Sequence, residues 1–224
     1  MPQSIPASGI SFLLVQSQFR LLEANSILSR GFPLNEPLPI LIAKYLWVVL
    51  WLYWLVSARK LKAVKKRESW QERLQHMLPL IAAYFLLFST RVHFGWLNER
   101  FVSDTQAVGW TGVSLTAAGV AFAIWARWHL GENWSSSVTL KADHELIRNG
   151  PYRFVRHPIY TGILLAMAGT ALAVGELRGV FSFLITLASF YRKARREEQF
   201  LLQEFGDRFK AHASQTGMFL PRFS

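Results

Sequence analysis

The chain has 224 residues, of which 51% are apolar and 14% aromatic, and only 17% are charged. A soluble globular protein has about 25% charged residues, so this composition excludes an ordinary soluble enzyme, a disordered chain and a collagen. The sequence has no cysteine, which excludes disulfides, thiolate metal ligands and cysteine nucleophiles. The formal charge of +11 suits either a nucleic-acid-binding protein or a membrane protein, and the positions of the basic residues decide between them.

Five apolar stretches have the length, or nearly the length, of about 20 residues that a helix needs to cross a bilayer. They cover residues 38–57, 77–95, 107–128, 158–175 and 178–191. The last two are short and are separated by a turn that contains glycine, so we expect them to form a tight helical hairpin. The sequence therefore predicts an all-α integral membrane protein with five transmembrane helices.

The basic residues are distributed unequally between the two sides of these predicted spans. Eighteen of them lie in residues 58–76, in residues 129–157 and in the tail after Tyr191, whereas four lie in the opposite loops and the N-terminal stretch. Cytoplasmic loops carry the excess of Lys and Arg, so we expect the C-terminus in the cytoplasm and the N-terminus outside. This orientation accounts for the positive charge, and we expect no nucleic-acid partner.

The predicted spans divide the chain into three parts. Residues 1–36 lack the N-terminal positive cluster of a signal peptide, and we expect them to form an interfacial segment. Residues 37–128 contain three spans and form a helical membrane scaffold. Residues 129–224 contain a long polar loop, the helical hairpin and an amphipathic C-terminal helix.

The polar loop before the fourth span holds residue types that can carry chemistry. Gly150-Pro151 predicts a turn, and Arg156-His157-Pro158 places a cation and an imidazole before a helix whose first turn suits Pro158. His157 could cap this helix or contact a ligand. Small residues recur on one face of the helix and would allow another helix to approach closely: Gly162, Ala166, Gly169 and Ala173.

The stretch after residue 191 continues the helical pattern with polar residues. Lys193 and Glu197 are four residues apart and share a helix face, and apolar residues follow at the same spacing from Leu201. We expect the fifth span to leave the membrane and continue as an amphipathic cytoplasmic helix. The Glu197-Glu198 pair could offset the neighbouring arginines or contact a positively charged ligand.

A set of short motifs now carries a resemblance to a known family. These are His144-Glu145-Leu146-Ile147, Gly150-Pro151-Tyr152, Arg156-His157-Pro158, Tyr160-Thr161-Gly162 and, about 35 residues later, Glu197-Glu198. Over roughly residues 129–212 the sequence resembles the isoprenylcysteine carboxyl methyltransferase family. The motifs are specific to a broader group of integral membrane methyltransferases that includes phospholipid N-methyltransferases, and they are less specific for the methyl acceptor.

The resemblance implies a methyl donor, S-adenosyl-L-methionine, bound between the cytoplasmic loop and the C-terminal helix. It implies a lipid-like or prenylated substrate that enters sideways from the lipid bilayer. The residues that match the family's donor site are His144, Leu146, Ile147, Tyr152, His157, Pro158, Tyr160 and Glu197. No glycine-rich fingerprint follows a strand, so we expect no Rossmann domain. Transfer to an ionised carboxylate needs no metal, so no metal site is expected.

The resemblance also suggests how an anionic acceptor would be held. In the family an arginine four residues before the first glutamate meets the substrate carboxylate, and this chain has Lys193 there. Lysine keeps the charge without the two-pronged fork of arginine. We expect Lys193, helped by Arg156 or Arg192, to steer an isoprenylcysteine-type carboxylate for O-methylation. The alternatives are amine N-methylation, which needs His157 or Glu197 as a base, a nicotinamide-dependent membrane reductase, and a non-enzymatic interaction protein.

Overall fold

The computed structural model of the protein describes residues 36–57, 70–89, 93, 95–131 and 146–222. The chain divides into two compact units, Met1–Leu38 and Pro39–Ser224, and the described helices lie in the second apart from the first residue of α2. The described residues form helices and connecting segments, and their only β-type pairings are two isolated bridges. The prediction of an all-α fold is confirmed for this part of the chain.

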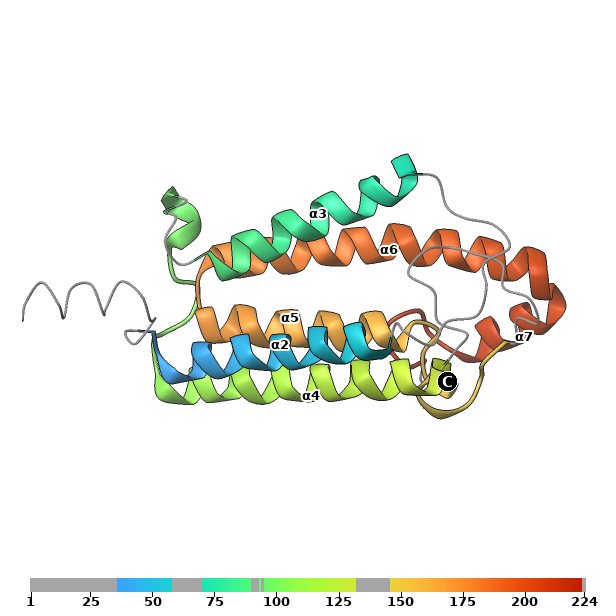
Figure 1. The fold of residues 1–224 in the computed structure, drawn as a ribbon, viewed down its shortest axis with the longest axis horizontal. Coiled ribbons are helices and arrows are strands. Elements are labelled where there is room, and N and C mark those ends of the chain that lie inside the picture. Colours follow the sequence, from blue (N-terminus) through green and yellow to red (C-terminus); the bar gives the residue numbers. More distant parts are fainter. Residues whose placement is uncertain (1–35, 58–69, 90–92, 94, 132–145, 223–224) are drawn as a thin grey trace, which may run out of the picture. The chain divides into compact units, whose positions relative to one another are not determined.

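The described part of the chain forms six α-helices and two 3₁₀ turns. They are α2 (Leu38–Ser57), α3 (Trp70–Phe88), the 3₁₀ turn η1 (Gly95–Asn98), α4 (Gln106–Leu130), the 3₁₀ turn η3 (Gly150–Arg153), α5 (Pro158–Val174), α6 (Leu177–Phe205) and α7 (Asp207–Gln215). Figure 1 shows α4 alongside α5, and α3 alongside α6. Among the described helices, α2 and α4 are long and apolar enough to cross a membrane, and α5 is a shorter apolar helix.

Three helix boundaries differ from the sequence prediction. The second predicted span, 77–95, corresponds to α3, which begins at Trp70 and ends at Phe88. Hydropathy missed the start of this helix because its first turns are polar. The fifth span is part of α6, a continuous helix of 29 residues that includes the expected polar extension. The extension breaks at Gly206, whose φ of 50° is a left-handed conformation that favours glycine, so α7 forms a separate helix.

Close contact between α4 and α5 depends on glycines that face each other. A Cβ atom added to Gly119 would lie 2.4 Å from the backbone nitrogen of Ala166, and one added to Gly162 would lie 2.6 Å from that of Ala123. Gly112 of α4 and Gly169 of α5, each seven residues from the first pair of glycines, meet in the same way. The small-residue face predicted for the fourth span is therefore confirmed, and it lets the two backbones pack directly against each other.

A buried polar network ties α2 to this pair of helices. The indole Nε1 of Trp47 donates to Oγ1 of Thr170 at 2.9 Å, and the Thr170 hydroxyl lies 3.1 Å from that of Thr116 on α4. The Thr170 hydroxyl also donates to the carbonyl of Ala166 at 2.8 Å. All three side chains of the network are almost fully buried, so their hydrogen bonds have no competition from water.

A buried arginine fixes the N-terminal end of α6. Arg178 is 4% exposed and donates from Nε to Oε2 of Glu176 at 2.6 Å. Its NH1 group donates to carbonyls at the C-terminal end of α3, among them Leu87 at 3.0 Å and Ser89 at 2.8 Å. A cation at this position satisfies carbonyls that the helix end leaves without intrahelical partners. Arg178 thus links α3 to the start of α6.

We expect Thr170→Val to lower the free energy of unfolding by about 1–2 kcal/mol, because the change keeps the side-chain shape but leaves the Trp47 indole N–H without its acceptor in an apolar bundle. Thr111→Val on α4 is the matched control, since that hydroxyl is exposed and bonds within its own helix. Thermal or denaturant unfolding in detergent measures both. Equal stability of the two variants would show that the buried network does not stabilise the bundle.

Candidate functional site

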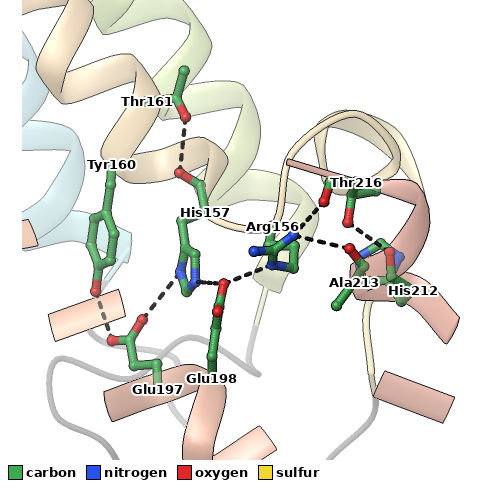
Figure 2. A network of polar contacts seen from close by, with 9 residues as sticks. All are labelled: Arg156, His157, Tyr160, Thr161, Glu197, Glu198, His212, Ala213 and Thr216. Carbon is green, nitrogen blue, oxygen red and sulfur yellow. Dashed lines mark hydrogen bonds and ion pairs between the residues drawn. The ribbon is translucent and has the colours of Figure 1, made fainter. Parts of the chain in front are cut away.

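An imidazole lies between two carboxylates at the start of α5. His157 immediately precedes the helix, and the ring of Pro158 is buried in its first turn. The His157 side chain is 7% exposed, with Nε2 3.2 Å from Oε1 of Glu198 and Nδ1 3.4 Å from Oε2 of Glu197. Figure 2 shows the imidazole bridging these two neighbouring residues of α6. The start of α5 is therefore bonded to α6 through one histidine.

Tyr160, one turn further along α5, completes one side of this arrangement. Its hydroxyl donates to Oε1 of Glu197 at 2.6 Å, and its ring stacks parallel to that of His157 with centroids 5.5 Å apart. Phe190 of α6 stacks on Tyr160 at 4.5 Å. The amino group of Lys193 lies 5.7 Å from the Tyr160 ring centroid and 4.0 Å from Oε1 of Glu197. An aromatic and cationic surface thus surrounds one oxygen of Glu197.

Arg156 lies on the other side of His157, next to α7 (Figure 2). Its Nε donates to Oε1 of Glu198 at 2.6 Å. Its NH1 group donates to the carbonyl of Ala213 at 3.3 Å and to the carbonyl of Thr216. The arginine therefore joins Glu198 to the C-terminal end of α7.

These contacts determine the charges of the site. Burial alone would lower the pKa of His157, but hydrogen bonds to the two glutamates and their charges outweigh burial and raise it. Burial would raise the pKa of both carboxyls, yet hydrogen bonds from His157 and the charges of Lys193 and Arg156 keep the pKa values of Glu197 and Glu198 below their usual range. The two carboxylates thus stabilise the protonated form of His157, and the neighbouring cations stabilise the ionised form of both carboxylates.

The segment before His157 packs against the ends of α4 and α5. Tyr152 is 8% exposed and forms an apolar cluster with Ala126 and Ile159, against which Ile147 also packs. Burial, and then the charge of Glu197, raise the pKa of the Tyr152 phenol. This cluster holds the η3 turn beside Tyr160, which packs on the same residues.

The η3 turn is also fixed by a close approach between its first residue and α4. A Cβ atom added to Gly150 would lie 2.2 Å from the ring of His129, and the φ of Gly150 is +55°. Only glycine satisfies both conditions. His129 itself lies 3.3 Å from the carbonyl of Trp125 through Nδ1. The glycine predicted to form a turn is therefore the point where the loop meets α4.

The structure brings together the central part of the predicted site. Glu197 contacts His157, Tyr160 and Lys193, and these residues are bordered by Ile147, Tyr152 and Pro158. Leu146 is partly buried in the adjoining segment. Arg156 belongs to the same network but lies on the far side of Glu198 from Glu197. His144 lies outside the described residues.

Three site residues were absent from the predicted set. Phe190 precedes Lys193 and Glu197 by three and seven residues, so helical spacing could have identified it. Glu198 was noticed as half of an acidic pair, but its partners Arg156 and His157 could not be inferred from sequence. Phe219, which contacts His157 edge-on with centroids 6.2 Å apart, had no sequence signal.

The arrangement can bind an organic cation beside an aromatic surface. The Glu197 side chain is 23% exposed, compared with 13% for Glu198, so Glu197 is the more accessible carboxylate. The ammonium group of an amino-acid moiety would suit this carboxylate by charge, and aromatic rings suit a flat heterocycle. Within the described residues no group of three or more His, Asp or Glu side chains could hold a metal ion.

Comparisons with known proteins match the part of the chain that carries most of these residues. A family model described as phospholipid methyltransferase matches residues 107–208, which include α4, α5 and α6 up to its end. The protein-S-isoprenylcysteine O-methyltransferase of Schizosaccharomyces pombe is 30% identical over 94 residues, covering 41% of this chain and 40% of the relative. The 3-oxo-5-alpha-steroid 4-dehydrogenase 1 of Mus musculus is 28% identical over 137 residues, covering 57% of this chain and 52% of the relative.

A solved structure shares the fold. It is the eukaryotic intramembrane Ras methyltransferase, isoprenylcysteine carboxyl methyltransferase, with 22% identity and a TM-score of 0.50, and the match covers 66% of this chain and 52% of that one. The chain thus spans about half the length or less of these relatives. The family model, the methyltransferase relatives and the shared fold lead to one conclusion: over residues 107–208 this chain is similar to membrane methyltransferases.

Proposed function

We propose that the protein transfers a methyl group from S-adenosyl-L-methionine to a lipid-like acceptor in the membrane. The observation that carries this proposal is the contact between Glu197, His157 and Tyr160, three residues of the family motifs that come from two different helices. When bound, the donor supplies an electrophilic methyl group on a sulfonium sulfur. The protein's contribution is to hold donor and acceptor in line and to exclude water; such positioning can supply about 7–11 kcal/mol of a reaction barrier.

The donor site in this proposal is built around Glu197. Its carboxylate would hold the donor's ammonium, because the pKa of Glu197 is kept low and the side chain remains partly accessible. Tyr160 and Tyr152 would line the adenosine side, with His144, Leu146, Ile147 and Pro158 contributed by the loop and the start of α5. His157 would orient Glu197 through the hydrogen bond between them.

A carboxylate is the acceptor that the electrostatics of the site favour. Methylation of a carboxylate forms one O–C bond and breaks one S–C bond, and no proton has to be removed. An amine acceptor must first lose a proton. His157 is poorly suited to take that proton, because both of its ring nitrogens already face carboxylate oxygens of Glu197 and Glu198. We therefore favour carboxyl O-methylation of an isoprenylcysteine-type substrate.

Lys193 is the cation that would steer such a carboxylate. Its amino group lies over Tyr160 and within 4.0 Å of Glu197, and its side chain is 13% exposed. By contrast, the neighbouring Arg192 and Arg196 both bond Gln75 of α3. Arg156 would contribute positive potential from the far side of Glu198.

Two alternatives have specific support. The matching family model is described as phospholipid methyltransferase, which favours an amine acceptor. The similarity to a mouse steroid dehydrogenase favours redox chemistry with a nicotinamide cofactor. That similarity covers 57% of this chain, whereas the Schizosaccharomyces pombe methyltransferase covers 41%. Titration of the purified protein in detergent with S-adenosylhomocysteine and with NADPH separates methyl transfer from the redox alternative. Binding of NADPH alone would overturn the proposal.

Glu197→Gln is expected to weaken binding of S-adenosylhomocysteine about 10- to 100-fold, because it removes the charge that holds the donor's ammonium. His157→Ala should weaken it as well by releasing Glu197. Isothermal titration in detergent measures the affinity, and a melting curve confirms that each variant is folded.

Glu204→Gln is the matched control, since Glu204 is exposed two turns further along the same helix. This control should bind within about twofold of the unsubstituted protein. Wild-type affinity in both Glu197→Gln and His157→Ala would remove these residues from the donor site.

Lys193→Ala is expected to lower turnover of a prenylated cysteine at least tenfold. The variant removes the amino group that we propose to contact the acceptor carboxylate directly. Lys193→Arg should retain or raise turnover, since arginine supplies the two-pronged fork. Arg195→Ala removes the same charge from an exposed position and should have little effect. Radiolabelled methyl transfer into the lipid phase measures all three. Normal turnover by Lys193→Ala, or labelling of amine lipids alone, would favour the phospholipid-like alternative.

The proposed topology has five spans, an external N-terminus and the donor site on the cytoplasmic side, with residues 1–36, 37–128 and 129–224 as its three parts. The excess of basic residues on one side supports it. A reporter enzyme fused after Ser224 should therefore be active only when the reporter works in the cytoplasm. Activity confined to an externally active reporter would reverse the assignment.

A further inference from the structure

The segment that follows α7 runs alongside the residues that precede α5. We call residues 216–219 the C-terminal strap. The backbone N–H of Arg156 donates to the carbonyl of Gly217 at 2.9 Å, and that of His157 donates to the carbonyl of Met218 at 3.1 Å. Val155 and Gly217 form a parallel β-bridge. The strap is thus paired, backbone to backbone, with the residues that carry the imidazole.

Side chains reinforce this pairing from both ends of the strap. Arg156 donates to the carbonyl of Thr216, and the hydroxyl of Thr161 donates to the carbonyl of Phe219 at 2.8 Å. A Cβ atom on Gly217 would lie 1.8 Å from the carbonyl oxygen of Leu220, so the chain turns too tightly here for any other residue. These contacts fix the point at which the strap passes the site.

The strap carries one aromatic side chain into the site. The Phe219 ring lies edge-on to His157 with centroids 6.2 Å apart and to Tyr160 with centroids 6.5 Å apart. His157 and Tyr160 are themselves stacked within 4° of parallel. Phe219 therefore contacts both members of the stacked pair, while Phe190 contacts Tyr160 from α6.

The contacts of Arg156 connect the strap to the charged pair as well. The same guanidinium bonds Thr216 of the strap and Glu198, and Glu198 bonds Nε2 of His157. A displacement of the strap would therefore remove the contacts of Phe219 with His157 and Tyr160. It would also loosen Glu198, one of the two carboxylates that bond the imidazole. Both effects act on the side chains to which we have assigned the donor.

We propose that the C-terminal strap is part of the donor site and that Phe219 is a positioning residue, which holds the His157–Tyr160 pair in the orientation that binds S-adenosylmethionine. This inference rests on the proposed function. The family model matches residues 107–208, and the inference assigns a role to residues that follow this range. Phe219 acts through His157 and Tyr160, so its loss affects donor affinity more than the rate of methyl transfer.

The test compares Phe219→Ala with Leu220→Ala in the full chain, using S-adenosylhomocysteine as the probe. Leu220 is the next residue and is 75% exposed, so it controls for general damage to the C-terminal end. Phe219→Ala removes two aromatic contacts and should weaken the affinity roughly tenfold, with a raised donor KM and a nearly unchanged kcat. Leu220→Ala should bind within about twofold of the unsubstituted protein, and Phe219→Tyr, which keeps the ring, within about threefold.

Amide hydrogen exchange provides the second measurement. In Phe219→Ala, exchange at Arg156 and His157 should become faster, because their N–H groups donate to the strap. If Phe219→Ala does not fold, Phe219→Leu, which keeps the apolar volume, must show the same loss of affinity. A folded Phe219→Ala or Phe219→Leu variant that binds the probe like the unsubstituted protein, while Glu197→Gln does not, overturns the strap proposal alone. Failure of the unsubstituted protein to bind the probe overturns the proposed function.

Discussion

The candidate site depends on the cost of burying charge at one end of an apolar helix bundle. His157 is 7% exposed, and an isolated charge at such a position would be strongly destabilising. The two carboxylates of Glu197 and Glu198 offset this cost by accepting from both ring nitrogens, and Lys193 and Arg156 compensate the carboxylates in turn. Removal of any member leaves a partner buried without its counter-charge. This mutual dependence fixes α5 against α6 where the two helices meet the polar loop.

The apolar part of the bundle provides the rigid support that such a site needs. Facing glycines bring the backbones of α4 and α5 into direct contact, and hydrogen bonds from Trp47 through Thr170 attach α2 to both. Arg178 joins α3 to α6 at the other end. The geometry of His157 and Tyr160 is therefore set by packing along the whole of α5. This arrangement places His157 and Tyr160 at the start of α5 in contact with Glu197 of α6, with the η3 turn and α7 packed nearby.

Local patterns predicted what depends on neighbouring residues in the chain. The small-residue face of α5 follows from helical spacing. The motif around His157, together with Glu197, indicated the candidate site, and these two residues lie in contact. Contacts between distant segments obey no spacing rule. The bond from Thr161 to Phe219 joins residues 58 apart, and the break at Gly206 depends on one glycine in an otherwise helical pattern. The strap and the role of Glu198 as a partner of Arg156 could therefore be seen only in three dimensions.

The central claim is that Glu197 and the stacked His157–Tyr160 pair bind the methyl donor. An experimental structure of the full chain in complex with S-adenosylhomocysteine tests it most directly. The account predicts the ligand's ammonium within hydrogen-bonding distance of a Glu197 carboxylate oxygen and its adenosine beside Tyr160 and Tyr152. Density for the ligand at a site that touches neither Glu197 nor Tyr160 would contradict the account.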